Sequence, residues 1–302
     1  MNFKKYNRLL GFLSGFCAFI VYLLTVEPTA SYWDCAEYIS TSAKLQIGHP
    51  PGAPLFQMLG AVFSILAFEN TQIAYAINMM SVTSSALTIV FMFWSVSLLG
   101  KKILKVKSEI SSEESFKIFG AAFLTTFTFM FTDSFWFNAV EAEVYAMATC
   151  LMSIMFWLSL KWESEMNTPR GDRWLVLISF LVGLSFGVHF MALLTIPAMG
   201  MLYYFKNYKK VTLKGFIVAN LISVAILLFI FKLLLPSTLA FFGNSEVFFI
   251  NNFGLPFNSG TIIAGLIIIA SFYYALRYTH KKNWVNINTA VLCTLFILVG
   301  FA

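Results

Sequence analysis

Charged residues are scarce in this sequence. They make up 11% of the 302 residues, against roughly 25% in an average soluble domain. Apolar residues make up 59%, and they occur in long runs separated by charged clusters. This composition excludes a disordered chain and is typical of a polytopic membrane protein. The net charge of +6 does not indicate nucleic acid binding, because membrane proteins collect Lys and Arg in their cytoplasmic loops.

Cysteine is also rare, and several catalytic motifs are missing. Three of the four cysteines lie in apolar runs and only Cys35 lies in a polar segment, so no disulfide framework is predicted. The sequence contains no GxxxxGK[ST], GxGxxG, HExxH or CxxC motif. These absences argue against a nucleotide-driven pump, a Rossmann enzyme, a zinc peptidase and a thiol redox protein.

Apolar runs of about 20 residues are long enough to cross a bilayer as helices. We expect an all-α protein with about nine crossings, at residues 9–26, 73–99, 117–135, 141–160, 174–187, 188–205, 213–235, 261–279 and 284–302. Five basic clusters lie between or before these runs, and the positive-inside rule places them in the cytoplasm. They are Lys4, Lys5 and Arg8; Lys101, Lys102, Lys105 and Lys107; Lys161, Arg170 and Arg173; Lys206, Lys209, Lys210 and Lys214; and Arg277, Lys281 and Lys282.

The basic clusters also constrain the number of crossings between them. The chain from Arg8 to Lys101 must cross an even number of times, so the short run 55–68 is predicted at the outer interface or in a re-entrant position. Residues 27–72 then form a large first extracytoplasmic loop. The same argument requires two crossings within residues 174–205, so we expect this stretch to be a tight helical hairpin that turns near Gly187 to His189. The first run can also be read as a cleaved signal peptide, but its length and bulky side chains favour a retained helix with a cytoplasmic N-terminus.

The polar residues most informative about function are concentrated in the first outer loop. Asp34 and Glu37 are three residues apart, which puts both carboxylates on one face of a helix. The segment 48–54 contains three prolines and cannot be helical, so we expect a fixed loop that holds His49. Outside a membrane, such a carboxylate pair usually lies on a solvated helix face, and such a proline-rich segment usually only forms a turn. Here neighbouring aromatic residues such as Trp33 place the stretch at the interface, where a carboxylate pair is costly unless it is used.

The segments WDCAEY and GHPPGAPLF, within residues 33–56, resemble a known family. A helix, an outer loop with Asp-x-x-Glu, and then His-Pro-Pro before a short apolar helix resembles the start of the GT-C superfamily of membrane glycosyltransferases, and most of all its protein O-mannosyltransferase-like family. The resemblance covers about residues 8–200. It implies a single GT-C-like transmembrane domain over 1–302, with short interfacial helices in the first loop, and we expect this chain to be the N-terminal part of a longer protein.

The resemblance also implies a reaction. Such enzymes move a sugar, with mannose as one candidate, from a polyprenyl-phosphate carrier to a hydroxyl of an extracytoplasmic acceptor, here expected to be a protein, with inversion at the sugar carbon. Asp34 matches the general base, and flanking aromatic residues would raise its pKa toward a working value. Glu37 would hold the acceptor or a divalent cation, whose requirement stays open, and His49 would contact the sugar or the phosphate. The expected location is the inner (cytoplasmic) membrane.

Three further positions and one turn extend this candidate site. Asn138, Glu141 and Tyr145 are predicted to share one face at the head of a helix, where they cap the helix or line the pocket by resemblance to GT-C relatives. Glu141 is preferred to Glu143. His189, at the predicted outer turn, is either a packing residue or a group that meets the carrier phosphate.

Two other function classes compete with the enzyme. A membrane transporter or flippase of amphipathic or lipid-linked solutes usually places polar groups near the bilayer midplane and often shows repeated halves. This sequence shows no repeat, and its acidic residues gather at the outer boundary. A non-catalytic membrane subunit is the third alternative. The distribution of acidic residues favours the glycosyltransferase.

Overall fold

The computed structural model describes residues 2–106, 110–168 and 170–302. Helices account for the regular structure, and the described ranges contain no strand, which confirms the all-α prediction. The chain forms two compact units, Met1–Ser164 with Leu184–Thr195, and Glu165–Gly183 with Ile196–Ala302. Lys107, from the second basic cluster, lies outside the described residues.

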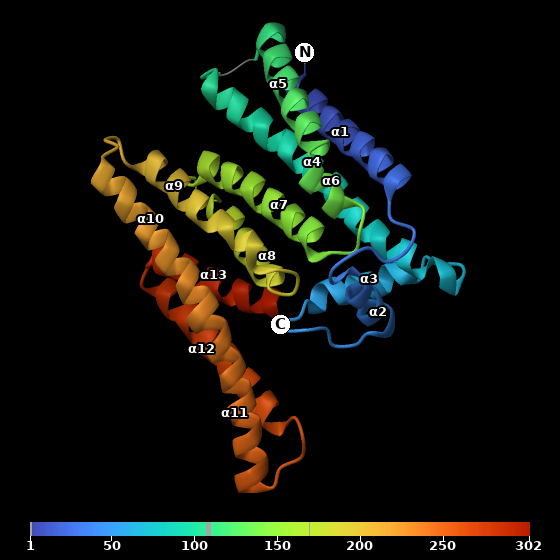
Figure 1. Ribbon diagram of the computed structural model, residues 1–302. Coiled ribbons are helices and arrows are strands. Elements are labelled where there is room, and N and C mark those ends of the chain that lie inside the picture. Colours follow the sequence, from blue (N-terminus) through green and yellow to red (C-terminus); the bar gives the residue numbers. More distant parts are fainter. Residues whose placement is uncertain (1, 107–109, 169) are drawn as a thin grey trace. The chain divides into compact units, whose positions relative to one another are not determined.

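The first unit is a bundle of long helices with two short helices at one end (Figure 1). Trp94 Nε1 donates to the carbonyl of Asn7, and Asn78 Nδ2 donates to the carbonyl of Glu27, so the first and fourth helices run antiparallel. The elements of this unit are α1 (Phe3–Thr25), α2 (Cys35–Lys44), α3 (Pro54–Ser64), η1 (Asn70–Gln72), α4 (Ile73–Ile103), α5 (Ser112–Met130), α6 (Asp133–Ala139), α7 (Val144–Glu165) and η2 (Phe190–Leu194).

Basic residues gather at one end of this bundle. The Lys101 ammonium lies 5.4 Å from the ring centroid of Phe3, which stacks on Phe119 with centroids 4.8 Å apart. Lys102 pairs with Glu163 near the end of α7. The start of α1, the end of α4 and the start of α5 therefore share one end. Among the described residues between the first two basic clusters, only α1 and the helical stretch that ends with α4 are long and apolar enough to cross a membrane, which agrees with the parity argument. The membrane side on which these clusters lie stays a prediction.

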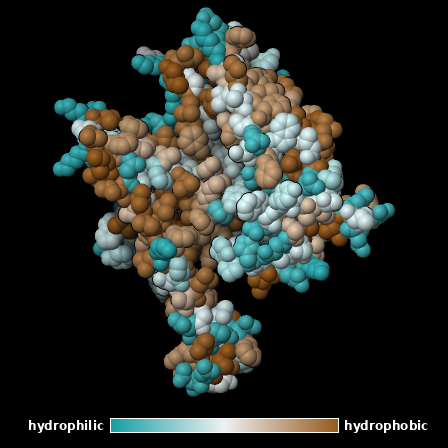
Figure 2. Space-filling model, viewed as in Figure 1, coloured by the Kyte–Doolittle hydropathy of each residue, from teal (hydrophilic) through white to brown (hydrophobic). Residues whose placement is uncertain are grey.

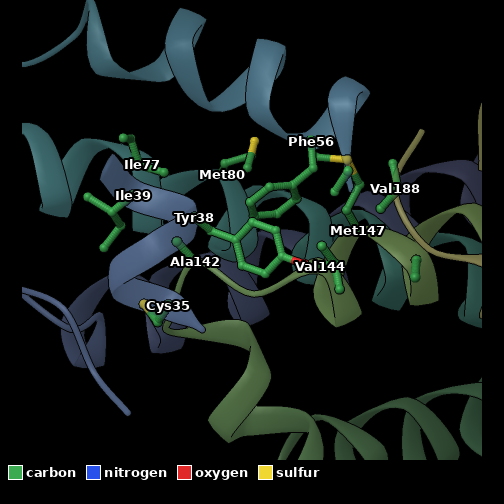
Figure 3. Close-up of a cluster of buried hydrophobic side chains, with 12 residues drawn as sticks. Cys35, Tyr38, Ile39, Phe56, Ile77, Met80, Ala142, Val144, Met147 and Val188 are labelled. Atoms are coloured by element: carbon green, nitrogen blue, oxygen red, sulfur yellow. The ribbon is translucent and has the colours of Figure 1, made fainter. Parts of the chain in front are cut away.

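The opposite end of the first unit holds α2 and α3. Asn78, fully buried in α4, donates to the carbonyls of both Glu27 and Thr29 at 2.7 and 2.9 Å. Beside it a hydrophobic cluster joins α2, α3, α4, the start of α7 and the turn before η2 (Figure 3). Its fully buried members are Cys35, Ala53, Phe56, Ile77, Ala142 and Ala148. The segment predicted to be the first outer loop is thus folded into the bundle.

The second unit contains the remaining helices. They are α8 (Asp172–Ser185), α9 (Thr195–Asn207), α10 (Leu213–Leu228), the π-helical segment η3 (Phe229–Leu234), α11 (Leu235–Phe253), α12 (Ser259–Lys281) and α13 (Val285–Phe301). The run predicted at 213–235 is longer than expected, because the π turn carries the helix through Pro236, which lies in the first turn of α11. Glu246 accepts the backbone N–H groups of Asn258 and Thr261, where α12 begins.

The predicted count of nine crossings is not confirmed. Among the described residues, five helices are long and apolar enough to cross a membrane, or six if α5 and α6, which meet at a 70° bend, form one span. The helices break where the hairpin turn was predicted, since α8 ends at Ser185 and η2 begins at Phe190, and α8 and α9 have only 14 and 13 residues. The apolar helices, with apolar residues over much of the surface in Figure 2, identify a multi-pass membrane protein.

The contact between α1 and α4 depends on a glycine. A Cβ atom at Gly15 would lie 2.3 Å from Val90 Cγ2 and 3.0 Å from the carbonyl oxygen of Ala86, whereas a Cβ atom at Gly120 would meet nothing within 4 Å. We therefore expect Gly15→Ala to lower the free energy of unfolding by about 1–3 kcal/mol, because backbone and a β-branched side chain cannot easily move. Gly120→Ala, the matched control, should leave it unchanged or raise it slightly. Thermal melting in detergent measures both, and equal melting temperatures would contradict this packing.

Candidate active site at the start of α2

Asp34 stands at the N-cap position of α2. The residue before it, Trp33, has φ 59°, a left-handed conformation that is uncommon outside glycine and that clusters at functional sites. The Asp34 side chain makes no capping hydrogen bond and is 56% exposed. The side chains of Tyr32 and Trp33 are exposed as well, so they do not bury the carboxylate as the sequence led us to expect. Asp34 therefore presents an accessible carboxylate.

Glu37 is held by His49. The His49 backbone N–H donates to Glu37 Oε1 at 2.6 Å, and His49 Nδ1 lies 3.1 Å from Glu37 Oε2. These hydrogen bonds lower the pKa of Glu37, so it is an acceptor at neutral pH and Nδ1 carries the hydrogen. Both oxygens of Glu37 are occupied in this way. The carboxylate positions the imidazole, and the predicted contact with an acceptor or cation stays untested.

The other ring nitrogen of His49 faces Asp34. Nε2 lies 3.7 Å from Asp34 Oδ2, which is too long for a direct hydrogen bond. Ligand atoms of Asp34, Glu37 and His49 all lie within 4.8 Å of one another, and in the described part of the chain no other group of His, Cys and acidic residues is this close. A divalent cation could be held here by these residues. Such binding remains a prediction.

The proline-rich loop before α3 is fixed at both ends, as predicted. Gly52 N–H donates to the carbonyl of His49, which closes the turn, and Gln57 Nε2 donates to Thr41 Oγ1 and so joins α3 to α2. The first free N–H groups of α3, at Leu55 and Phe56, donate to the carbonyl of Gly187. This last contact brings the turn that contains His189 to the same end of the bundle.

His189 and Tyr145 form an aromatic pair beside this loop, with ring centroids 5.3 Å apart. His189 Nδ1 accepts the backbone N–H of Met191 at 3.1 Å, so Nε2 carries the hydrogen of the neutral ring. In this tautomer His189 offers a hydrogen-bond donor. Tyr38 lies between this pair and the Asp34 cluster. Burial, together with the smaller effects of nearby carboxylates and Tyr145, raises the pKa of Tyr38 to about 12.

The predicted shared face of Asn138, Glu141 and Tyr145 is wrong. One helix ends at Ala139 and the next begins at Val144, so the three residues do not belong to one helix. Asn138 donates to the carbonyl of Ser134 within its own helix. The prediction extended the helical period through a break that the sequence does not mark.

Two carboxyls in this break are buried, and they have different neighbours. Glu141 is 2% exposed and accepts the hydroxyl of Ser31; burial raises its pKa, which the hydroxyl partly offsets. Glu143 is 5% exposed and lies close enough to Glu141 and Asp34 to feel their negative charges. Burial first, then the negative charges of Glu141 and Asp34, raise the pKa of Glu143 to about 7. The structure thus brings Glu143 against Asp34, whereas the sequence favoured Glu141.

Comparison with known proteins places these residues in a family. The model of the protein O-mannosyl-transferase TMEM260 N-terminal domain matches residues 34–212. The chain belongs to this TMEM260 family. The matched part begins at Asp34 itself and contains Glu37, His49, Glu143 and His189, so the whole candidate site lies inside the TMEM260 domain.

Two curated TMEM260 relatives align with about half of the chain. Protein O-mannosyl-transferase tmem260 of Dictyostelium discoideum is 25% identical over 156 residues, which is 51% of this chain and 17% of the relative. Protein O-mannosyl-transferase TMEM260 of Mus musculus is 23% identical over 165 residues, or 55% and 21%. The aligned part thus spans about a fifth of these relatives. No solved structure matches the chain.

The raised pKa of Glu143 predicts a pH-dependent stability. Protonated Glu143 is favoured in the folded state, so its stabilisation is complete below the ordinary carboxyl pKa of 4.5 and is lost as the pH rises through about 7. The full loss is about 3 kcal/mol at most. Glu143→Gln cannot ionise, so it should melt close to wild type at pH 5 and above it at pH 8. Melting curves in detergent test this, and a constant difference between the two proteins would contradict it.

Proposed function

We propose that this chain carries the catalytic centre of a membrane O-glycosyltransferase, which transfers a sugar from a polyprenyl-phosphate carrier to a hydroxyl of an acceptor protein on the extracytoplasmic side. The names of its relatives suggest mannose as the sugar. The observation that carries the proposal is the position of Asp34. Its carboxylate is exposed, caps no helix and faces the ring of His49 inside the part of the chain that matches the O-mannosyl-transferase family.

In this proposal Asp34 is the general base. It accepts the proton of the acceptor hydroxyl as that oxygen bonds to the anomeric carbon, and the bond from this carbon to the carrier phosphate breaks. The polyprenyl phosphate leaves with the electron pair. A single displacement of this kind inverts the anomeric carbon. No separate nucleotide is needed, because the bond to the carrier phosphate supplies the free energy of transfer.

The neighbouring side chains have supporting roles. Glu37, bonded through both oxygens to His49, keeps the imidazole in one orientation, so that its Nε2 can meet a polar group of the sugar or phosphate near Asp34. The neutral tautomer of His189 can donate a hydrogen bond to the same substrate from the other side of Tyr38. These two imidazoles would bind the donor, and Asp34 would bind the acceptor.

Replacing Asp34 tests the reaction. With the full-length protein in membranes, a polyprenyl-phosphate mannose donor and extracytoplasmic acceptor proteins, Asp34→Asn should lower transfer about 10²- to 10⁴-fold, the usual effect of losing a general base. The protein level should not change, because the side chain is exposed and makes no capping bond.

Asp133→Asn is the matched control, since Asp133 is also an exposed acid in the first turn of a helix, α6, in the same unit. It should transfer at the wild-type rate. Normal transfer by Asp34→Asn would remove Asp34 from the mechanism, and no transfer by wild type would remove the proposed reaction.

A further inference from the structure

We propose that Asn78 is a positioning residue for Asp34. The side-chain amide of this one residue, in α4, binds the chain on both sides of Asp34 and so fixes where the backbone of the proposed base stands against the bundle. The inference rests on the proposed function, because it concerns how the proposed base is held.

Asn78 is a polar side chain in an apolar setting. It is 0% exposed, and its helix belongs to the stretch Asn70–Ile103, which is long and apolar enough to cross a membrane. Ile77 and Met80, on the same helix, belong to the hydrophobic cluster shown in Figure 3. A buried amide is costly unless hydrogen bonds replace the water that it loses, and polar groups in such helices are usually functional. The partners of Asn78 therefore indicate its role.

These partners lie outside α4. Asn78 Nδ2 donates to the carbonyls of Glu27 and Thr29 at 2.7 and 2.9 Å, and Oδ1 accepts the thiol of Cys35, with the sulfur 4.0 Å away. Both donors and the acceptor of the amide are thus directed to the segment that leads into α2. Asparagines in other helices instead donate to the carbonyl one turn earlier in their own helix. Examples are Asn207, Asn220 and Asn252.

The segment that Asn78 holds carries Asp34. Residues 26–34 belong to no helix or strand, so their backbone groups depend on side chains or on distant backbone for hydrogen bonds. Thr29 lies five residues before Asp34 and Cys35 directly follows it, and the same amide contacts both. The path of the chain through Asp34 is therefore tied at two points to one position on α4.

The path between these two points includes a strained residue. Trp33 has φ 59°, which a tryptophan keeps only where its surroundings impose it. Its own side chain is 88% exposed, so burial of the indole does not impose it. The restraint comes from the flanking backbone. The Ser31 hydroxyl adds a contact with Glu141 on one side, whereas the amide of Asn78 spans both sides.

Two replacements of Asn78 remove the amide and differ in volume. Asn78→Leu is close to asparagine in size and Asn78→Ala leaves space, but neither can donate to the two carbonyls. In the full-length protein in membranes, with a polyprenyl-phosphate mannose donor and extracytoplasmic acceptor proteins, both should lower kcat/KM for the acceptor about 10- to 100-fold. KM for the acceptor should rise because the base is displaced, and KM for the donor should not change, because the two imidazoles are held by other contacts.

Asn288→Leu is the matched control. Asn288 Nδ2 also donates to two oxygens of another helix, the carbonyl of Leu276 at 3.1 Å and Thr279 Oγ1 at 2.8 Å, but it lies in the second unit. This variant loses the same two donors. It should keep the wild-type kcat and both wild-type KM values.

Hydrogen exchange supplies a readout that does not need activity. Peptides that cover residues 26–38 should exchange about tenfold faster in both Asn78 variants and at the wild-type rate in Asn288→Leu. Wild-type exchange in both Asn78 variants would overturn the inference. So would a loss of transfer in only one of them, because volume and not the amide would then matter. An equal loss in both with unchanged KM for the acceptor would overturn it as well, since a smaller folded fraction explains that result.

The two proposals fail in different ways. If wild type transfers no sugar, or Asp34→Asn transfers normally, the proposed function is lost, but faster exchange in the Asn78 variants still supports the contact between α4 and the segment before α2. If Asp34→Asn is inactive while both Asn78 variants transfer at the wild-type rate, the general base stands and the positioning role falls.

Discussion

The packing of one side of α2 against the starts of α4 and α7 holds the candidate site together. Cys35, Tyr38 and Ile39 are buried in the cluster that these elements share, and the period of the helix then turns Asp34 and Glu37 toward the outside. The apolar side chains thus set the direction of the polar ones. The loop with His49 follows, because its turn and the start of α3 are bonded to α2 and to the turn at Gly187. Loss of this packing would separate the two carboxylates from the imidazole.

Two buried carboxyls at one helix break are costly, and the fold compensates each one differently. A charge moved out of water is destabilised unless hydrogen bonds replace the water. Glu141 receives the hydroxyl of Ser31 from the loop before α2, whereas at Glu143 burial and nearby negative charges raise the pKa to about 7 and so favour the neutral acid. Apolar side chains could fill this space at lower cost. Buried acids with raised pKa values gather at functional sites, and here they surround the residue that we propose as the base.

The sequence alone predicted those features of the site that depend on residues close together in the chain. The spacing of Asp34 and Glu37 and the prolines around His49 predicted a helix face and a fixed loop, and both are present. A choice between Glu141 and Glu143 requires knowing how α7 is rotated relative to α6. That rotation is set by contacts from distant parts of the chain, such as the N–H of Glu27 on the carbonyl of Val140, which no local pattern reveals. The predicted number of crossings is not confirmed for a similar reason, because apolar runs predict helices but not their lengths.

Accessibility decides between the two acids as the base. The pKa of Glu143, near 7, is by itself the better match to proton transfer at neutral pH. However, a general base must reach the hydroxyl of a protein acceptor and must afterwards return the proton to water, so geometry comes before acidity. Glu143 is 5% exposed, while Asp34 is 56% exposed and faces the ring of His49. The exposed Asp34 therefore remains the proposed base, and Glu143 would reach an acceptor hydroxyl only if the hydrophobic cluster around α2 opened.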